Sequence, residues 1–288
     1  MQRVEAPWTL HAECYTLLIK LSEIPAGLYD PREEAWNDES NGTFAGGVGT
    51  IMIVRYTSTP VGSYDELLFA PGIFTVPQPS AGHPKIPKKA LRIARIYVSQ
   101  RTTTYNGRMN WNIPKHLARF EFSAPVTKRG EAPPEKQTVK VFAPGTEQGD
   151  GTAPFFACTF QPWRWVPAIP FNMKYAPMSV RQVQPPIPEP AGFKSAVEAE
   201  LNSDGKIDPY DISAKNEVAV APGTDVWRSY DVSGKVARMR GCWAEVLPSI
   251  SGGEEAGKYF PQGLQPWSVG GWMEEAELII EKPLEWKL

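Results

Sequence analysis

The chain has 288 residues, with 30 Lys and Arg against 32 Asp and Glu, so its formal net charge is −2. Hydrophobic residues make up 42% and charged residues 22%, which is typical of a globular protein that can bury a sizeable core, and we expect residues 1–288 to form one domain. There is no block of basic residues and no run of 18 apolar residues, so neither a nucleic-acid nor a membrane partner is expected.

Turn-forming residues are abundant, with 29 Pro and 24 Gly, and favour short strands over long helices. In the first half of the chain, strands are predicted at residues 15–21, 49–56, 60–69 (after an initial turn), 91–99 and 118–123. The dipeptide Asn106-Gly107 indicates a turn.

In the second half, residues 124–154 are predicted to form an exposed excursion around a short strand at 139–142. The aromatic segments at 162–167 and 169–175 are expected to line a core or pocket rather than face solvent. Further strands are predicted at 227–232, 237–246 and 272–280, and the best helical candidate is 196–201. The predicted fold class is therefore mainly β with minor helices.

Cofactor and metal signals are weak. The cysteines and histidines are few and scattered, with no metal-ligand spacing (Cys14, Cys158, Cys242; His11, His83, His116). The unpaired cysteines and the N-terminus, which lacks a signal-like apolar run, indicate a reducing, cytoplasmic location. Residues 200–211 approximate a calcium-binding loop, but Pro209 and the lack of a final glutamate favour a simple turn. No metal, nucleotide or flavin is expected.

Lys115 is the candidate for covalent chemistry. It directly follows Pro114 in an aromatic and apolar segment, where Trp111 and Ile113 are candidate walls. A lysine in apolar surroundings has a lowered pKa, because burial disfavours the ammonium form, and it can then act as a Schiff-base nucleophile. The alternative is a solvated lysine at the start of a strand.

Two segments together resemble the acetoacetate decarboxylase-like family. The first, residues 59–68, resembles that family's Gly-x-Tyr-x-Glu motif through Gly62, Tyr64 and Glu66. The second contains Gly107-Arg108 and, five residues later, Pro114-Lys115, which matches the family's Gly-Arg and Pro-Lys spacing. The matched region runs from about residue 55 to residue 122.

The resemblance implies a cone-shaped antiparallel β-barrel whose apolar cavity holds Lys115. It implies a lyase of the decarboxylase type, in which Lys115 forms an imine with a β-keto acid, β-dicarbonyl or polyketide-like small molecule of secondary metabolism. Glu66 would move a proton and Arg108 would hold an anionic oxygen, while Tyr64, Met109, Trp111 and His116 would line the substrate site. A homo-oligomer is also implied.

Three departures from the family pattern affect this expectation. His116 replaces a second lysine, Met109 replaces a glutamate, and no arginine stands near residues 7–15, where the decarboxylases carry one for the substrate carboxylate. These changes weaken lysine activation and carboxylate binding.

Structural roles are also open for the same residues. Arg108 is expected in an ion pair under the turn, and His116 on the face opposite Lys115, because neighbouring side chains of a strand point to opposite faces.

Two other functions stay open. The first is a lysine-independent cyclase, isomerase, aldolase or dehydratase on the same fold, which would rearrange a carbon skeleton without releasing CO2. The second is a protein that binds a ligand in the barrel without turning it over.

Overall fold

The structure is a computed structural model that describes residues 1–288 except 84, 176–179, 203–206 and 249–253. Its main element is an 11-stranded sheet in the order β8-β7-β4-β3-β1-β16-β15-β11-β10-β9, with β12 pairing to β15 beside this path. These strands have the following bounds: β1 Trp8–Lys20, β3 Val48–Ser58, β4 Tyr64–Ala70, β7 Arg95–Val98, β8 Lys115–Leu117, β9 Arg119–Phe122, β10 Gln137–Phe142, β11 Phe156–Pro162, β12 Ile169–Asn172, β15 Val232–Val246 and β16 Val269–Ile280.

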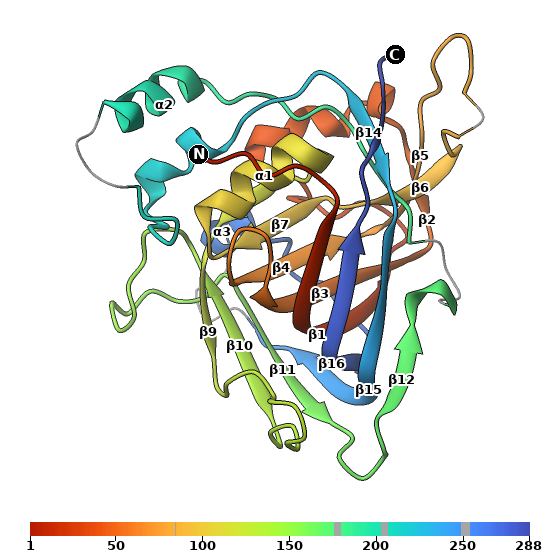
Figure 1. The fold of residues 1–288 in the computed structure, drawn as a ribbon, viewed down its shortest axis with the longest axis vertical. Helices are drawn as coiled ribbons and strands as arrows, with labels where there is room; N and C mark the ends of the chain where they lie inside the picture. Colours follow the sequence, from red (N-terminus) through yellow and green to blue (C-terminus); the bar gives the residue numbers. More distant parts are fainter. Residues whose placement is uncertain (84, 176–179, 203–206, 249–253) are drawn as a thin grey trace.

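The large sheet curls into a nearly closed barrel (Figure 1). Its two outermost strands, β8 and β9, are separated in the chain by a single residue, Ala118. Both ends of the sheet therefore lie at one point of the chain, which brings the edges together. The prediction of a mainly-β barrel is confirmed.

A second sheet and several short helices complete the fold. The six-stranded sheet has the order β17-β14-β13-β6-β5-β2. Its strands are β2 Phe44–Gly46, β5 Gly72–Thr75, β6 Lys89–Arg92, β13 Gln182–Gln184, β14 Trp227–Tyr230 and β17 Leu284–Trp286. The helices are α1 Arg101–Trp111, α2 Phe193–Leu201 and α3 Glu254–Tyr259, with 3-10 turns η1 Pro31–Asn37, η2 Glu39–Asn41, η3 Met173–Tyr175, η4 Ala214–Asn216 and η5 Val218–Val220. Among the described residues, no helix has the length and apolar character needed to cross a membrane.

Apolar side chains cover both faces of the large sheet. In β3, for example, Ile51 and Ile53 belong to one buried cluster and Val54 to another, as alternation along a strand requires. The first cluster joins strands that are far apart in the sheet order, such as β1 and β11, where the rings of Tyr15 and Phe160 lie 5.2 Å apart. We call it the barrel-interior cluster. The second, the α1-face cluster, includes Trp111 of α1 and Ile113.

Four predictions about elements are wrong. Residues 101–111 form α1 rather than a turn at Asn106-Gly107, and because this helix is the crossover, β7 and β8 pair in parallel instead of antiparallel. The expected strand at 91–99 is divided into β6 and β7. The strand β10 belongs to the barrel, since its Val139 and Val141 are fully buried. Finally, the aromatic segment 162–167 was expected to line a core or pocket, but its Trp165 is 80% exposed.

Other expectations hold or lie outside the described part. The helix predicted at 196–201 is α2, and the strands predicted at 15–21, 49–56, 227–232, 237–246 and 272–280 are present with shifted ends. Part of the calcium-like loop, residues 203–206, lies outside the described residues.

Candidate functional site: a buried lysine and glutamate

The centre of the candidate site is an ion pair between Lys115 and Glu66. The Lys115 Nζ and the Glu66 Oε2 atoms are 2.8 Å apart, and the two residues are 4% and 3% exposed. Lys115 also donates hydrogen bonds to the Thr103 Oγ1 atom at 2.9 Å and to the Tyr64 hydroxyl at 3.3 Å. The Tyr56 hydroxyl donates to the second oxygen of Glu66 at 3.2 Å. An ammonium group, a carboxylate and three hydroxyls therefore meet in a buried space.

The strand pairing explains why residues so distant in sequence meet. Glu66 on β4 lies opposite Val54 on β3 and Val98 on β7, and Lys115 on β8 lies opposite Ile96 on β7. All of these side chains point to the α1-face side of the sheet. Thr103, in the first turn of α1, accepts the hydrogen bond from Lys115 and covers the site on the helix side.

Gly107 makes room for the lysine stem. A Cβ atom at this position would lie 2.7 Å from Lys115 Cδ and 2.9 Å from Cε, so the lysine stem would have to move to admit a side chain. The Gly107 position in α1 therefore serves close packing of the lysine and not the turn that the sequence suggested. Gly107 of the Gly-Arg pair and Lys115 of the Pro-Lys pair therefore pack directly against each other.

The electrostatics of the pair differ from the prediction. Burial by itself lowers the pKa of Lys115, but the adjacent Glu66 carboxylate, helped by Tyr64, outweighs it, so the pKa is raised above its usual value. Lys115 is therefore an ammonium group at neutral pH in this arrangement. The expected lowering by apolar walls is wrong because the first contact of the amine is a carboxylate.

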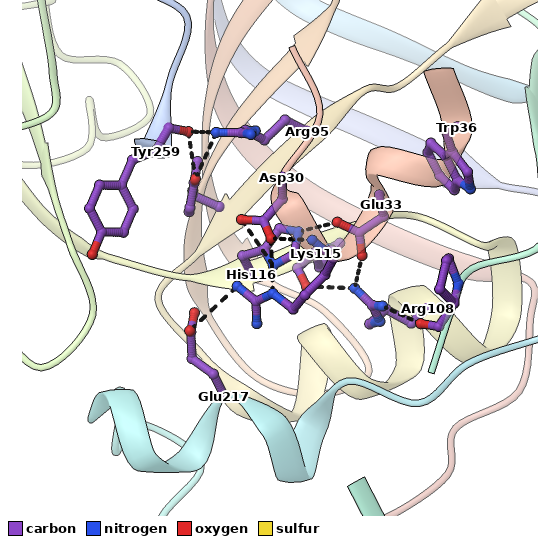
Figure 2. A network of polar contacts seen from close by, with 12 residues as sticks. Asp30, Glu33, Trp36, Arg95, Arg108, Lys115, His116, Glu217 and Tyr259 are labelled. Carbon is purple, nitrogen blue, oxygen red and sulfur yellow. Dashed lines mark hydrogen bonds and ion pairs between the residues drawn. The ribbon is translucent and has the colours of Figure 1, made fainter. Parts of the chain in front are cut away.

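A second buried network lies beside the first and contains Arg108 and His116 (Figure 2). The Arg108 Nη1 atom is 2.9 Å from Glu33 Oε1, and the His116 Nε2 atom is 2.9 Å from Glu33 Oε2. Arg108 also donates to the carbonyl oxygens of Pro222 and Pro188. All three side chains are fully buried, so Arg108 occupies the structural role left open for it.

His116 points away from Lys115, as alternation along β8 predicts. Its ring lies near Tyr97 of the barrel-interior cluster, with centroids 6.0 Å apart. Burial alone would raise the pKa of Glu33, but His116 and Arg108 outweigh burial and lower it to about 2. The network is therefore a charged clamp that holds β8 to η1 and α1.

One group in this clamp resembles a set of metal ligands. Side-chain atoms of Asp30, Glu33 and His116 lie within 4.8 Å of one another. However, Asp30 accepts hydrogen bonds from Arg32, and Glu33 pairs with Arg108, so arginines already balance both carboxylates. We therefore interpret the group as part of the clamp.

The remaining predicted site residues have structural surroundings. Tyr64 contacts the lysine directly, with Lys115 Nζ 4.9 Å from the ring centroid. Trp111 packs edge-on against Trp8 and donates from its indole nitrogen to the Glu281 carbonyl. The Met109 side chain is half-buried on α1, and its backbone carbonyl accepts a hydrogen bond from Arg228.

Sequence reasoning missed Tyr56, Thr103 and Glu33. Tyr56 lies on the same face of β3 as Val54, which is opposite Glu66, but only the register of β3 against β4 reveals that the tyrosine reaches the carboxylate. Thr103 was missed because the helix that carries it was not predicted.

Two cavities in the described part of the chain lie away from the Lys115 and Glu66 pair. One, of about 920 Å³, crosses strands β12, β15, β16, β1 and β3, and the other, of about 280 Å³, lies between Ile51, Phe156 and Phe260. Neither is lined by Lys115. Segment 169–175, expected to line a core or pocket rather than face solvent, contributes Phe171 and Tyr175 to the larger cavity, but Ile169 and Tyr175 are 62% and 75% exposed, so the expectation of burial is wrong for these two side chains.

The nearly closed, curled β-sheet is the barrel that the sequence resemblance implies. No protein-family model matches the chain, and no curated protein matches it. Solved structures do match. An acetoacetate decarboxylase-like enzyme from Sphingomonas wittichii RW1 is 10% identical over 99% of this chain and 94% of that chain, with a TM-score of 0.56.

Two further structures give the same result. The acetoacetate decarboxylase from Legionella pneumophila subsp. pneumophila str. Philadelphia 1 is 10% identical over 98% of this chain and 88% of that chain, with a TM-score of 0.53. The enduracididine biosynthesis enzyme MppR, complexed with the condensation product of pyruvate and imidazole 4-carboxaldehyde, is 12% identical over 98% and 90%, with a TM-score of 0.52. This chain therefore has the acetoacetate decarboxylase-like fold.

Proposed function

We propose that the protein is an enzyme that acts on the carbonyl group of a small molecule through Lys115, with Glu66 as the proton carrier. The main support is the buried contact of 2.8 Å between the Lys115 amine and the Glu66 carboxylate. A fixed amine and carboxylate in one site can exchange a proton and present either form to a substrate.

The chemistry follows from the pair. When a carbonyl carbon approaches, the Lys115 ammonium passes its proton to Glu66, and the neutral amine adds to the carbonyl. Loss of water then gives an iminium ion. A water molecule adds to the second carbonyl of a β-dicarbonyl substrate, and the bond between that carbon and the α-carbon breaks; its electron pair moves into the iminium to give an enamine, and the other fragment leaves as a carboxylic acid. Protonation of the enamine and hydrolysis of the resulting iminium release the ketone and restore Lys115. The hydroxyls of Tyr64 and Thr103 already lie against the lysine nitrogen and would orient it.

The charges favour an uncharged substrate. Among the described residues, Lys115 contacts a carboxylate and two hydroxyls, and Arg108 is paired with Glu33. The Lys115 ammonium and the Glu66 carboxylate balance each other, so this pair offers no net positive charge to hold the carboxylate of a β-keto acid. We therefore favour a neutral β-dicarbonyl compound, and carbon–carbon lysis without CO2 release, over decarboxylation.

A substrate needs a path to the buried Lys115 nitrogen. Because Lys115 is only 4% exposed, a substrate reaches it when the elements that cover it move. The α1 helix and the N-terminal residues bonded to it, such as Val4 through Asn106 at 2.8 Å, cover this face.

A second candidate keeps the lysine charged. The raised pKa of Lys115 favours an ammonium group that donates a hydrogen bond to an enolate oxygen while Glu66 removes a proton. That arrangement suits a cyclase, isomerase, aldolase or dehydratase that forms no covalent intermediate.

The test is borohydride reduction with a panel of β-diketones and β-keto acids, followed by intact-protein mass spectrometry. The imine route predicts an adduct that is lost in Lys115→Ala and kept in Lys20→Ala, a matched change of an exposed lysine. Substrate turnover without any trapped adduct would refute the imine and support the charged-lysine route. Binding without turnover over hours would refute both and leave a ligand-binding protein.

A further inference from the structure

The outer face of the large sheet is covered along only part of its strands. This face is the side that carries the α1-face cluster. Cys14 of β1 and its cross-strand neighbour Val54 of β3 are buried in that cluster. Leu18, four residues further along β1, points to the same side by alternation but is only half-buried. The face is therefore partly open to solvent beyond Cys14.

Apolar side chains occupy this open part of the face. Trp243 of β15 pairs with Val269 of β16 in the strand register, and both face outward, because the adjacent Cys242 belongs to the barrel-interior cluster. Trp267 continues the row of Val269, since its backbone nitrogen donates to the Leu18 carbonyl at 2.8 Å beside β1. Trp243, Trp267 and Val269 are 51%, 49% and 39% exposed. A row of exposed apolar side chains thus crosses neighbouring strands.

Two more tryptophans extend this row from the end of β11. The ring of Trp163 lies over Gly241 of β15, where a Cβ atom would collide with it. The centroid of this ring is 5.3 Å from that of Trp243 and 6.2 Å from that of Trp165, which is 80% exposed. We call the resulting patch the tryptophan face; it consists of Trp163, Trp165, Trp243, Trp267 and Val269.

The area of the tryptophan face matches the apolar centre of a stable protein interface. With about 250 Å² for a whole tryptophan, the exposed fractions of Trp165, Trp243 and Trp267 amount to about 450 Å². A standard interface buries about 800 Å² of each partner, of which about 60%, or about 480 Å², is apolar. The face is therefore large enough to form the core of a dimer contact with polar residues around it.

The charges on the rim of the tryptophan face are self-complementary. Lys20 at the end of β1 and Glu245 on β15 are exposed and face outward by alternation with Leu18 and Trp243. Because β16 lies between β1 and β15, these two residues are separated by two strand spacings, or about 10 Å. A two-fold axis between them would place each lysine opposite the glutamate of a second copy.

We propose that the tryptophan face is the contact surface between two copies of this chain in a two-fold symmetric dimer. Trp165, Trp243 and Trp267 form its apolar centre, and Lys20 pairs with the partner's Glu245 on both sides of the axis. One lysine and one glutamate leave this rim without net charge, so self-association brings no like charges together. An anionic membrane surface would instead require an excess of basic residues around the tryptophans.

Sedimentation velocity of the full chain between about 0.1 and 100 µM tests the proposal. Wild-type protein is a dimer whose dissociation constant is micromolar or lower, as interfaces of this size have. Trp243→Ala raises the dissociation constant by at least about thirtyfold, because a central tryptophan is lost from both copies. Leu201→Ala, which shortens an exposed apolar side chain on α2, leaves it unchanged. Circular dichroism confirms that each variant keeps the fold.

An exchange of charges tests the symmetry of the contact. Glu245→Lys or Lys20→Glu places like charges opposite each other and weakens the dimer about threefold to tenfold, whereas the double variant Lys20→Glu/Glu245→Lys restores it. Lys20→Ala alone has little effect, because an exposed ion pair contributes little.

Three results would overturn the proposal. They are a monomer at every concentration, a dimer that Trp243→Ala leaves intact, and charge reversals whose effects add in the double variant. A monomer that binds phosphatidylcholine vesicles, and loses this binding in Trp165→Ala, would assign the tryptophan face to a membrane surface instead.

Discussion

Replacement of Glu66 by Gln tests whether Lys115 is a buried ammonium ion. Glu66→Gln preserves the size of the side chain but leaves the Lys115 nitrogen, 4% exposed, without its counter-ion. Loss of one partner of a buried pair costs about 3–5 kcal/mol of the free energy of unfolding. We expect a loss of this size at pH 7.

The pH dependence of the free energy of unfolding gives a more specific test. In the wild type, the pKa of Lys115 is raised in the folded state, so the pair contributes stability that is fully present below the unfolded pKa and is lost as pH rises through the folded pKa. In Glu66→Gln, burial without a counter-ion places the folded pKa below the unfolded value. The unfolded state then binds more protons, and the stability of the variant rises with pH by up to about 1.4 kcal/mol per unit.

The assay is urea unfolding of wild type and variant between pH 7 and pH 10, followed by fluorescence. The other titrations are common to both proteins, so the difference in free energy isolates Lys115. It should shrink as pH rises, and the double variant Glu66→Gln/Lys115→Met should show no such trend. A loss below about 1 kcal/mol that is the same at every pH would show that Lys115 is not held as a buried ammonium.

Three further predictions concern packing and charge. Gly107→Ala should destabilise the protein by about 1–3 kcal/mol in thermal unfolding, because the lysine stem at 2.7 Å must move, although alanine favours a helix; a stabilised variant would contradict this packing. Glu33→Gln should cost about 3–5 kcal/mol at pH 7 by leaving Arg108 buried without its partner. Since the wild-type pKa of Glu33 is about 2, its stability contribution is present above the unfolded pKa and lost as pH falls, so the variant should show a shallower acid unfolding limb; an unchanged limb would argue against the clamp. Glu275→Gly should raise the free energy of unfolding by about 1 kcal/mol by relieving the positive φ, as chemical denaturation can measure, and a destabilised variant would show that the conformation is not strained.

Local patterns in the sequence account for much of the barrel. Strands such as β3 and β16 are predictable because their residues suit a pleated surface. The link between the segment with Glu66 and the segment with Lys115 rests on a family resemblance that the fold supports. The helix α1 was missed because Thr, Asn and Gly dominate it. These residues have poor helix propensity, and tertiary packing of the lysine over Gly107 decides their conformation.

The surroundings of the site depend on register and on long-range contacts. Glu33 lies 75 residues from Arg108 and 83 from His116, and no local pattern connects them. The pKa of Lys115 could not be predicted in its correct direction either, because burial and the carboxylate act in opposite senses and only the distance between the two groups decides the outcome.

The alternation along β8 makes the site sensitive to the length of the connection before it. Lys115 and His116 are neighbours in the chain, yet one faces α1 and the other the barrel interior. Deletion of one residue between Asn112 and Pro114 would draw β8 along β7 and exchange the two faces. Natural or engineered chains that differ by one residue in this connection would thus keep the barrel while presenting an imidazole, instead of an amine, to Glu66.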